Sequence, residues 1–261
     1  MLEAEHGRCK VPCRVRTESE EWVKGVLTLL FPHFRSTEVP HHLDLEQQAE
    51  SLDLELRRLL EDCGQPAQKI DEVVETFWRV LPMVRENLLL DAHATDEFDP
   101  ASESVDEVML AYPGFFATAV YRIAHELDCL SVGLVPRLLS EFAHRETGID
   151  IHPGAVIGVP VIIDHGTGLT IGQSTIIGKR VCLYQGVTLG ALAVKKSMAK
   201  SKRHPTIEDD VVIYSGATIL GGETVIGAGS VIGGNAWLTR SVPPGSVVTN
   251  RASRQTAETT P

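Results

Sequence analysis

The clearest pattern in this sequence is an aliphatic residue at every sixth position between residues 151 and about 242. Most of these residues are followed, four positions later, by a small or β-branched residue. A fixed internal period indicates a solenoid of stacked units. The aliphatic positions are Ile151, Ile157, Ile163, Ile171, Ile177, Leu183, Leu189, Ile207, Ile213, Ile219, Ile226, Ile232 and Leu238.

A period of six fits neither a helix nor an ordinary strand, because a helix repeats at three and four residues and a strand at two. It fits a short strand followed by a tight corner, with three such units closing one triangular coil. The aliphatic residues would then fill the interior. Glycines such as Gly158 and Gly172 directly follow an aliphatic position, where the absence of a Cβ suits a corner.

The first half of the chain has helical periodicity instead. Apolar residues at three- and four-residue spacing predict helices over residues 19–31, 43–63, 67–89, 105–111, 115–130 and 136–147. Ser19 is expected to cap the first helix, and Pro32 to end it. Pro82 is a possible kink in the third helix, and residues 90–104 are polar and turn-prone.

These two patterns predict an α+β chain with an all-helical N-terminal domain followed by a parallel β-helix. We expect the helical domain to span residues 18–149 and the β-helix to span residues 150–245. Residues 1–17 are expected to form a flexible leader, and residues 246–261 a flexible polar tail.

One segment breaks the repeat without changing its frame. Leu189 and Ile207 are eighteen residues apart, but the positions between them that should be aliphatic are Lys195 and Ser201. Neither side chain can face an apolar interior. Residues 191–206 are therefore predicted to form a loop extruded from the solenoid, and such loops commonly carry function.

Composition narrows the function classes. The chain has 261 residues, is 43% hydrophobic and carries a formal net charge of −11, which argues against a nucleic-acid surface. There is no apolar run of membrane-spanning length and no signal sequence, so we expect a cytoplasmic protein without a membrane partner. Five scattered cysteines favour reduced thiols. His6, Cys9 and Cys13 are too irregularly spaced to predict a metal site.

Polar clusters stand beside the breaks in the repeat. Two extra residues follow Asp164 and His165, and Asp150 begins the first unit. Asp150 and His165 can approach each other on adjacent coils. A carboxylate bonded to one imidazole nitrogen makes the other a better general base for an alcohol. The alternative is that these histidines only cap corners; their combination with charged neighbours at the breaks favours a site.

The extruded segment also carries a cluster of positive charge on an acidic protein. Its cationic residues are Lys195, Lys196, Lys200, Lys202 and Arg203. They can be solvated, or they can attract an anionic ligand such as a phosphate-bearing carrier. The sequence has neither a P-loop nor a glycine-rich dinucleotide motif, so nucleotide-binding folds lack support.

Several motifs together resemble the serine O-acetyltransferase family. They are DIHPGAVIG from Asp150, DHGTG from Asp164, VTLG from Val187, KRHPTI from Lys202 and SVPPGS from Ser241, preceded by DP at Asp99, GF at Gly114 and YRIAH from Tyr121. The resemblance covers residues 95 to about 249. It implies a left-handed parallel β-helix of hexapeptide repeats, and transfer of an acetyl group from acetyl-CoA to the hydroxyl of L-serine in cysteine biosynthesis.

The resemblance also implies roles for individual residues. His165 would be the general base, oriented by Asp150, and His204 would help to position the hydroxyl. Asp99 and Asp164 would hold the ammonium group of serine, and Arg203 its carboxylate. Acetyl-CoA would be a co-substrate, with no tightly bound cofactor and no metal. Its expected contacts are Thr188, Gly190, Ala191, Ser215, Gly216 and Gly234.

The same resemblance implies a homotrimer or a dimer of trimers, with active sites between subunits. A complex with O-acetylserine sulfhydrylase is not expected, because residues 259–261 read Thr-Thr-Pro rather than ending in isoleucine. The alternative function is another hexapeptide-repeat O-acetyltransferase acting on a sugar or other hydroxyl. A hexapeptide carbonic anhydrase would need a His-x4-His pair that is absent, and a pure scaffold would not need the breaks in the repeat.

Overall fold

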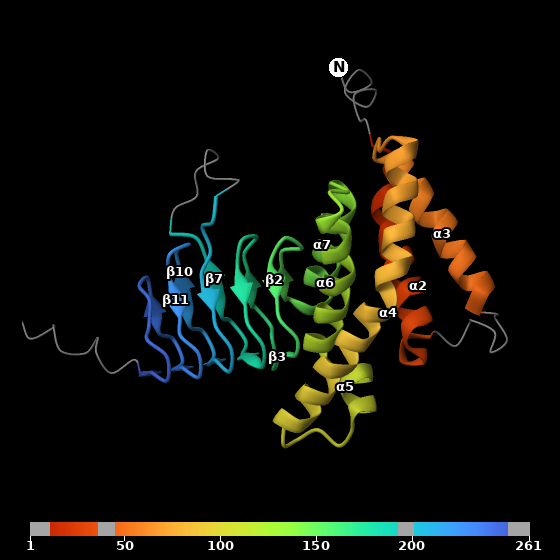
Figure 1. Cartoon of the computed structure of the whole chain (residues 1–261). Helices are drawn as coiled ribbons and strands as arrows, with labels where there is room; N and C mark the ends of the chain where they lie inside the picture. Colours follow the sequence, from red (N-terminus) through yellow and green to blue (C-terminus); the bar gives the residue numbers. More distant parts are fainter. Residues whose placement is uncertain (1–10, 36–44, 193–200, 250–261) are drawn as a thin grey trace, which may run out of the picture.

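The computed structural model describes residues 11–35, 45–192 and 201–249. Helices come first and a three-sided solenoid follows, side by side along one axis (Figure 1). The helical domain consists of α2 (Arg14–Leu30), the 3-10 turn η1 (Pro32–Phe34), α3 (Leu45–Asp62), α4 (Ala67–Phe98), α5 (Val105–Ala111), α6 (Pro113–Cys129) and α7 (Leu134–Thr147). The predicted order of a helical domain and a β-helix is confirmed.

The first helix begins earlier than predicted. α2 starts at Arg14, so residues 14–17 are not part of a flexible leader. Val15 is buried in the bundle and extends the apolar stripe by one turn. Ser19 is therefore not the N-cap; it lies inside the helix, where its hydroxyl donates to the Val15 carbonyl at 2.7 Å. Residues 1–10 lie outside the described part of the chain.

The third predicted helix is longer than expected. α4 continues to Phe98, through much of the segment predicted to be a turn. Leu88, Ala92 and Thr95 are buried on the face that also buries Val84, so the apolar stripe continues where the sequence becomes polar. Pro82 lies inside this helix. The extension determines where Asp99 stands, because that residue is the C-cap of α4.

The solenoid consists of short parallel strands arranged in three sheets. Sheet 1 has the order β1-β4-β7-β10-β13, sheet 2 β11-β8-β5-β2 and sheet 3 β14-β12-β9-β6-β3. The strands are β1 (Asp150–Ile151), β2 (Val156–Ile157), β3 (Val161–Ile163), β4 (Thr170–Ile171), β5 (Ile176–Ile177), β6 (Val181–Leu183), β7 (Thr188–Gly190), β8 (Thr206–Ile207), β9 (Val212–Ile213), β10 (Thr218–Leu220), β11 (Val225–Ile226), β12 (Val231–Ile232), β13 (Trp237–Leu238) and β14 (Val247–Val248).

The register explains the six-residue period. Ile151 pairs with Ile171, which pairs with Leu189, which pairs with Ile219. Equivalent positions therefore stack along the axis, and all but the last, the partly buried Leu238, are buried. β14 pairs with β12, so the solenoid includes residues 247 and 248, which we predicted to belong to the tail. Residues 250–261, with the Thr-Thr-Pro end, lie outside the described residues.

The two domains have separate cores that share one helix. The bundle core contains large aromatic side chains such as Trp22, Phe77 and Phe142, whereas the solenoid core is almost entirely aliphatic. Ala117 and Tyr121 on α6 belong to the solenoid core. The start of α6 approaches β3 closely, because a Cβ built on Gly114 would lie 2.1 Å from the Ile163 carbonyl oxygen. Only glycine fits there.

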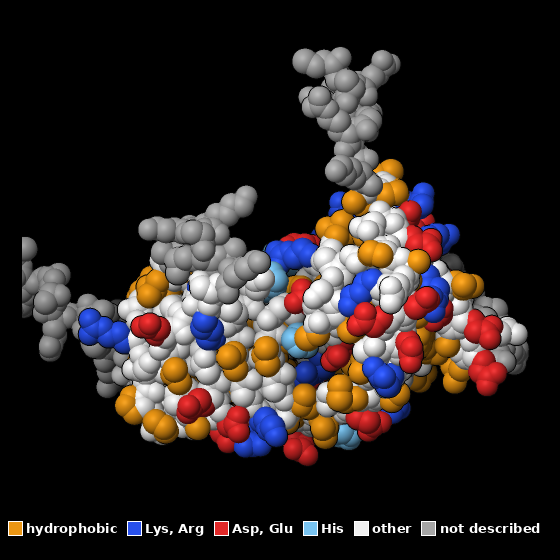
Figure 2. All heavy atoms as spheres, turned by 45° about the horizontal axis from the view of Figure 1, so that its top comes forward, with side chains coloured by type: hydrophobic (Ala, Val, Ile, Leu, Met, Phe, Trp, Pro, Cys, Tyr) orange, Lys and Arg blue, Asp and Glu red, His pale blue; other side chains and the backbone are white. Residues whose placement is uncertain are grey.

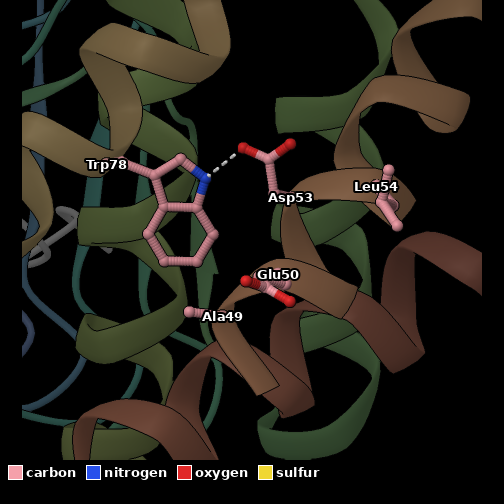
Figure 3. Close-up of a pocket in the computed structure, with 5 residues that line it drawn as sticks. All are labelled: Ala49, Glu50, Asp53, Leu54 and Trp78. Atoms are coloured by element: carbon pink, nitrogen blue, oxygen red, sulfur yellow. Dashed lines mark hydrogen bonds between the residues drawn. The ribbon is translucent and has the colours of Figure 1, made fainter. Parts of the chain in front are cut away.

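The helical domain has a hollow of its own. It measures about 470 Å³ and lies on α3 and α4, where Trp78 Nε1 donates to Asp53 Oδ1 at 2.9 Å (Figure 3). α3 stands far from the solenoid (Figure 1), so this hollow is remote from the predicted site. None of the helices in the described ranges is long and apolar enough to cross a membrane.

Candidate active site

The predicted base sits in a turn that the two inserted residues create between β3 and β4. His165 has a left-handed backbone (φ 58°), and Gly166 and Gly168 also have positive φ. The turn is closed by a hydrogen bond from the Gly166 amide to the Asp164 carbonyl at 2.6 Å. This geometry turns the imidazole outward: the side chain is 71% exposed, and its Nε2 lies 3.9 Å from Asp164 Oδ1.

Asp99 supplies a second carboxylate at this corner. It accepts hydrogen bonds from the Tyr112 hydroxyl at 2.6 Å and from the Ala101 amide at 2.8 Å. These two bonds, together with the nearby His165, hold the pKa of Asp99 below its usual value. Asp99, Asp164 and His165 form what we call the acidic corner, and its carboxylates suit a ligand ammonium group.

Asp150 lies on the coil next to this turn. β1 pairs with β4, so Asp150 stands opposite Thr170, and its amide donates to the Leu169 carbonyl at 2.9 Å. Its side chain makes no hydrogen bond to another described residue. Asp150 therefore lies on the coil next to the strand that follows the acidic corner, and its bond to His165 stays a prediction.

Arg203 and His204 precede β8, and Ser174, between β4 and β5, holds them at a different corner of the solenoid. The Ser174 hydroxyl oxygen accepts from the backbone amides of Arg203 at 2.9 Å and His204 at 3.1 Å. It also lies 2.9 Å from His204 Nδ1, which accepts from the Ser174 amide at 3.1 Å. We call Gln173, Ser174, Arg203 and His204 the basic corner.

These contacts define the chemical state of His204. Because Nδ1 accepts from a backbone amide, the neutral ring carries its proton on Nε2. Burial, followed by the charges of Arg203 and Lys202, lowers the pKa of His204 to about 4. At neutral pH the ring is therefore an uncharged N–H donor. The neighbouring His152 is also neutral, because burial and nearby cations lower its pKa to about 4.

Arg203 of the basic corner and the adjacent Lys202 line an open hollow of about 440 Å³. Arg203 Nη2 donates to Gln173 Oε1 at 2.7 Å, and Lys202 Nζ donates to the carbonyls of Ser174 at 2.6 Å and Pro205 at 3.1 Å. Figure 2 shows histidine and cationic side chains gathered where the solenoid meets the helices. Lys195, Lys196 and Lys200 lie outside the described residues.

One chain does not bring the two corners together. The acidic corner precedes β4 and the basic corner follows it, so a strand of sheet 1 stands between them. The predicted acetyl-CoA positions are divided in the same way. Ser215, Gly216 and Gly234 continue the acidic corner along later coils, where the Asn235 amide donates to the Ser215 carbonyl at 2.9 Å. Thr188 is on sheet 1, and Gly190 and Ala191 lead toward the basic corner.

The described residues contain no group of three His, Cys, Asp or Glu side chains placed to hold a metal ion. His6 and Cys9 lie outside those residues. The four described cysteines, Cys13, Cys63, Cys129 and Cys182, are free thiols.

Known proteins resemble this chain over most of its length, although no family model matches it. A serine acetyltransferase of Synechococcus elongatus is 43% identical over 254 residues, which cover 88% of this chain and 79% of that protein. The chain belongs to the serine acetyltransferase family. A second member, from Mycobacterium tuberculosis, is 43% identical over 60% of this chain and 67% of its own length.

Solved structures of the serine acetyltransferase family give the same fold. Serine acetyltransferase 1 of Entamoeba histolytica, in complex with L-cysteine, superposes with a TM-score of 0.80 at 32% identity, covering 87% of this chain and 85% of that one. The predicted left-handed parallel β-helix after a helical domain is therefore confirmed. Members of this family are acyltransferases.

Several residues at the two corners of this family member were not identified from the sequence. Ser174 and Gln173 look like ordinary repeat residues, and Tyr112 like the end of a helix. Tyr184 and Tyr214 stack along the edge that continues the acidic corner, with ring centroids 5.0 Å apart. The ring of Phe98 contacts that of Tyr184 edge-on, at 6.4 Å between centroids. The aromatic residues follow Leu183 and Ile213 in the repeat, and that shared position is the signal that could have identified them.

Proposed function

We propose that this protein is a serine O-acetyltransferase, which transfers the acetyl group of acetyl-CoA to the hydroxyl of L-serine and releases CoA. Family membership supports the reaction class. The observation that carries the choice of acceptor is the acidic corner, where an exposed imidazole stands beside two carboxylates. An amino acid with a hydroxyl group matches it, because its ammonium needs anions and its hydroxyl needs a base.

In the proposed reaction, His165 takes the proton of the serine hydroxyl as the oxygen attacks the thioester carbonyl, and Asp150 orients the imidazole. Asp99 and Asp164 hold the substrate ammonium. Arg203 binds the carboxylate, and the Nε2–H of neutral His204 donates to the hydroxyl region. The proton then passes to the departing CoA thiolate, so the acetyl group moves directly from sulfur to oxygen.

A covalent acyl-enzyme is not part of the proposal. Cys182 is the cysteine on the strand leading toward the acidic corner, but it is buried, and burial raises the pKa of its thiol to about 12. The thiolate, not the thiol, is the nucleophile. Direct transfer within a ternary complex therefore agrees better with the described residues.

We further propose that the complete site forms between neighbouring subunits of a trimer. The support is the division of the predicted residues between two corners, because a second chain can set its basic corner against the acidic corner of the first. Acetyl-CoA would then lie in the groove between the prisms, along Ser215, Gly216 and Gly234 of one chain and Gly190 and Ala191 of the other. A cytoplasmic location belongs to the same proposal.

The test is an assay of purified protein with acetyl-CoA and L-serine, following free CoA and identifying O-acetyl-L-serine by mass spectrometry. Serine-dependent CoA release is expected. Turnover with a hydroxyl sugar but not with serine would instead support the alternative acceptor. L-Cysteine carries the same ammonium and carboxylate as serine, so we expect it to compete with serine. Light scattering of an active monomer would contradict the shared site.

A further inference from the structure

A buried ion pair joins the helical domain to the first coil of the solenoid. Arg122 on α6 donates from Nε to Asp91 Oδ2 at 2.6 Å and from Nη2 to Asp91 Oδ1 at 2.8 Å. The side chains are 7% and 2% exposed, respectively. This bidentate pair fixes both the distance between α4 and α6 and their relative orientation.

The pair also bonds to the solenoid backbone. Asp91 Oδ1 accepts from the Val161 amide at the start of β3 at 2.9 Å. Arg122 donates to the carbonyls of Ile157 at 3.4 Å and Gly158 at 3.2 Å, at the end of β2. One ion pair therefore connects α4, α6 and the corner between β2 and β3.

α4 and β3 also pack against each other. Asp99 follows Asp91 by eight residues, a rise of about 12 Å along a helix. Asp164 follows Val161 by three residues, about 10 Å along a strand. These similar lengths bring Asp99 beside Asp164 and His165. A shift of α4 along β3 would therefore move Asp99 relative to Asp164 and His165.

Stability alone does not explain a charged pair at this place. Well-packed apolar side chains often stabilise a core as well as a buried ion pair does, whereas a bonded pair can specify one geometry among several. Resting on the function proposed above, we propose that Asp91 and Arg122 are positioning residues that set Asp99 against His165. They thereby control the affinity for the ammonium-bearing substrate.

Two conservative variants test this role. Asp91→Asn keeps the shape of the side chain and removes its charge. Arg122→Lys keeps the positive charge and removes the guanidinium group that donates two parallel hydrogen bonds to Asp91. Both should raise KM for serine by on the order of 10- to 100-fold, since a misplaced binding group costs about this much. KM for acetyl-CoA should change less than about twofold, because Asp99 touches only the acceptor.

A double-mutant cycle separates positioning from general damage. If Asp91 acts through Asp99, then Asp91→Asn should raise KM for serine in the wild type but not in an Asp99→Asn background. Additive effects in the two backgrounds would overturn the inference. Val73→Ala is the matched control, because it opens a cavity on the same helix far from the solenoid. It should lower Tm without changing either KM.

The outcomes distinguish this inference from the function on which it rests. Active wild type with an unchanged serine KM in both Asp91→Asn and Arg122→Lys overturns the inference alone, even if Tm falls. Absence of serine-dependent CoA release by the wild type overturns the proposed function and the inference together. A selective rise in serine KM that vanishes in the Asp99→Asn background supports both.

Discussion

The two corners of the solenoid hold histidines in opposite ways. His165 is 71% exposed, and its Nε2 lies 3.9 Å from Asp164 Oδ1, with Asp99 also nearby. His204 is 8% exposed and bonded through Nδ1 to Ser174. A general base must reach its substrate and exchange protons, whereas a hydrogen-bond donor works best when fixed and neutral. The solenoid thus exposes one histidine, His165, as the proposed general base and buries another, His204, as a neutral hydrogen-bond donor.

The largest expected effect concerns His165, the exposed histidine. His165→Ala should lower kcat by on the order of 10²- to 10⁴-fold, because the variant lacks a general base. KM for serine should change much less, and initial-rate kinetics at saturating acetyl-CoA measure both. His144→Ala, on α7 and outside the contacts described at both corners, is the control and should be near wild type. A folded His165→Ala protein with normal kcat would remove His165 from this role.

The second prediction concerns His204, the buried and hydrogen-bonded histidine. The Cβ of an alanine at Gly172 would lie 2.0 Å from Cδ2 of His204, so Gly172→Ala should push the ring away from Ser174. We expect a serine KM raised by up to roughly tenfold, the loss that one neutral hydrogen bond can account for, with a lower Tm.

Gly178→Ala provides the matched control, because Gly178 occupies the same repeat position at the third corner and would clash with Asp209. It should lower Tm but leave the serine KM of the folded protein unchanged. If both variants change KM alike, the effect comes from the solenoid as a whole and not from His204.

The smallest expected effect concerns pH. His204 and His152 have pKa values of about 4 in the folded protein, below the value of about 6.5 for an unfolded histidine. The unfolded chain therefore binds more protons between these values. Stability is fully present above about pH 6.5 and is lost as the pH falls toward 4.

Thermal melts from pH 7.5 to 4.5 check this expectation. Tm should fall with pH in this window, and His204→Gln should fall less steeply because one of the two buried imidazoles is gone. A pH profile of Tm identical to that of wild type would show that His204 titrates normally and is not held as a neutral donor.

The sequence predicted the solenoid far better than the helical domain. Each aliphatic position repeats the same environment, so the burial of Ile171 or Ile213 follows from the period alone. The extension of α4 to Phe98 could not be predicted from the sequence, because Asp91 looks like the start of a polar turn. Its burial depends on Arg122, 31 residues later, and no local pattern relates the two.

The candidate site shows the same division. The insertion after His165 and the motif at Arg203 marked both corners, since each interrupts the repeat. Ser174 was missed because a serine at a corner is ordinary, and its importance comes from contacts about 30 residues away. Whether Asp150 orients His165 remains a prediction, because that contact depends on side-chain placement in the complete site.

The docking of α4, α6 and α7 against the first coil has a further consequence. β1, β2 and β3 are the outermost strands of their sheets, and uncovered strand edges invite other chains to add on. A solenoid open at this end could extend from one molecule into the next as a filament. By occupying the end, the helices act as a terminal cap. At this end they cover the strands to which the solenoid of a second molecule could otherwise add.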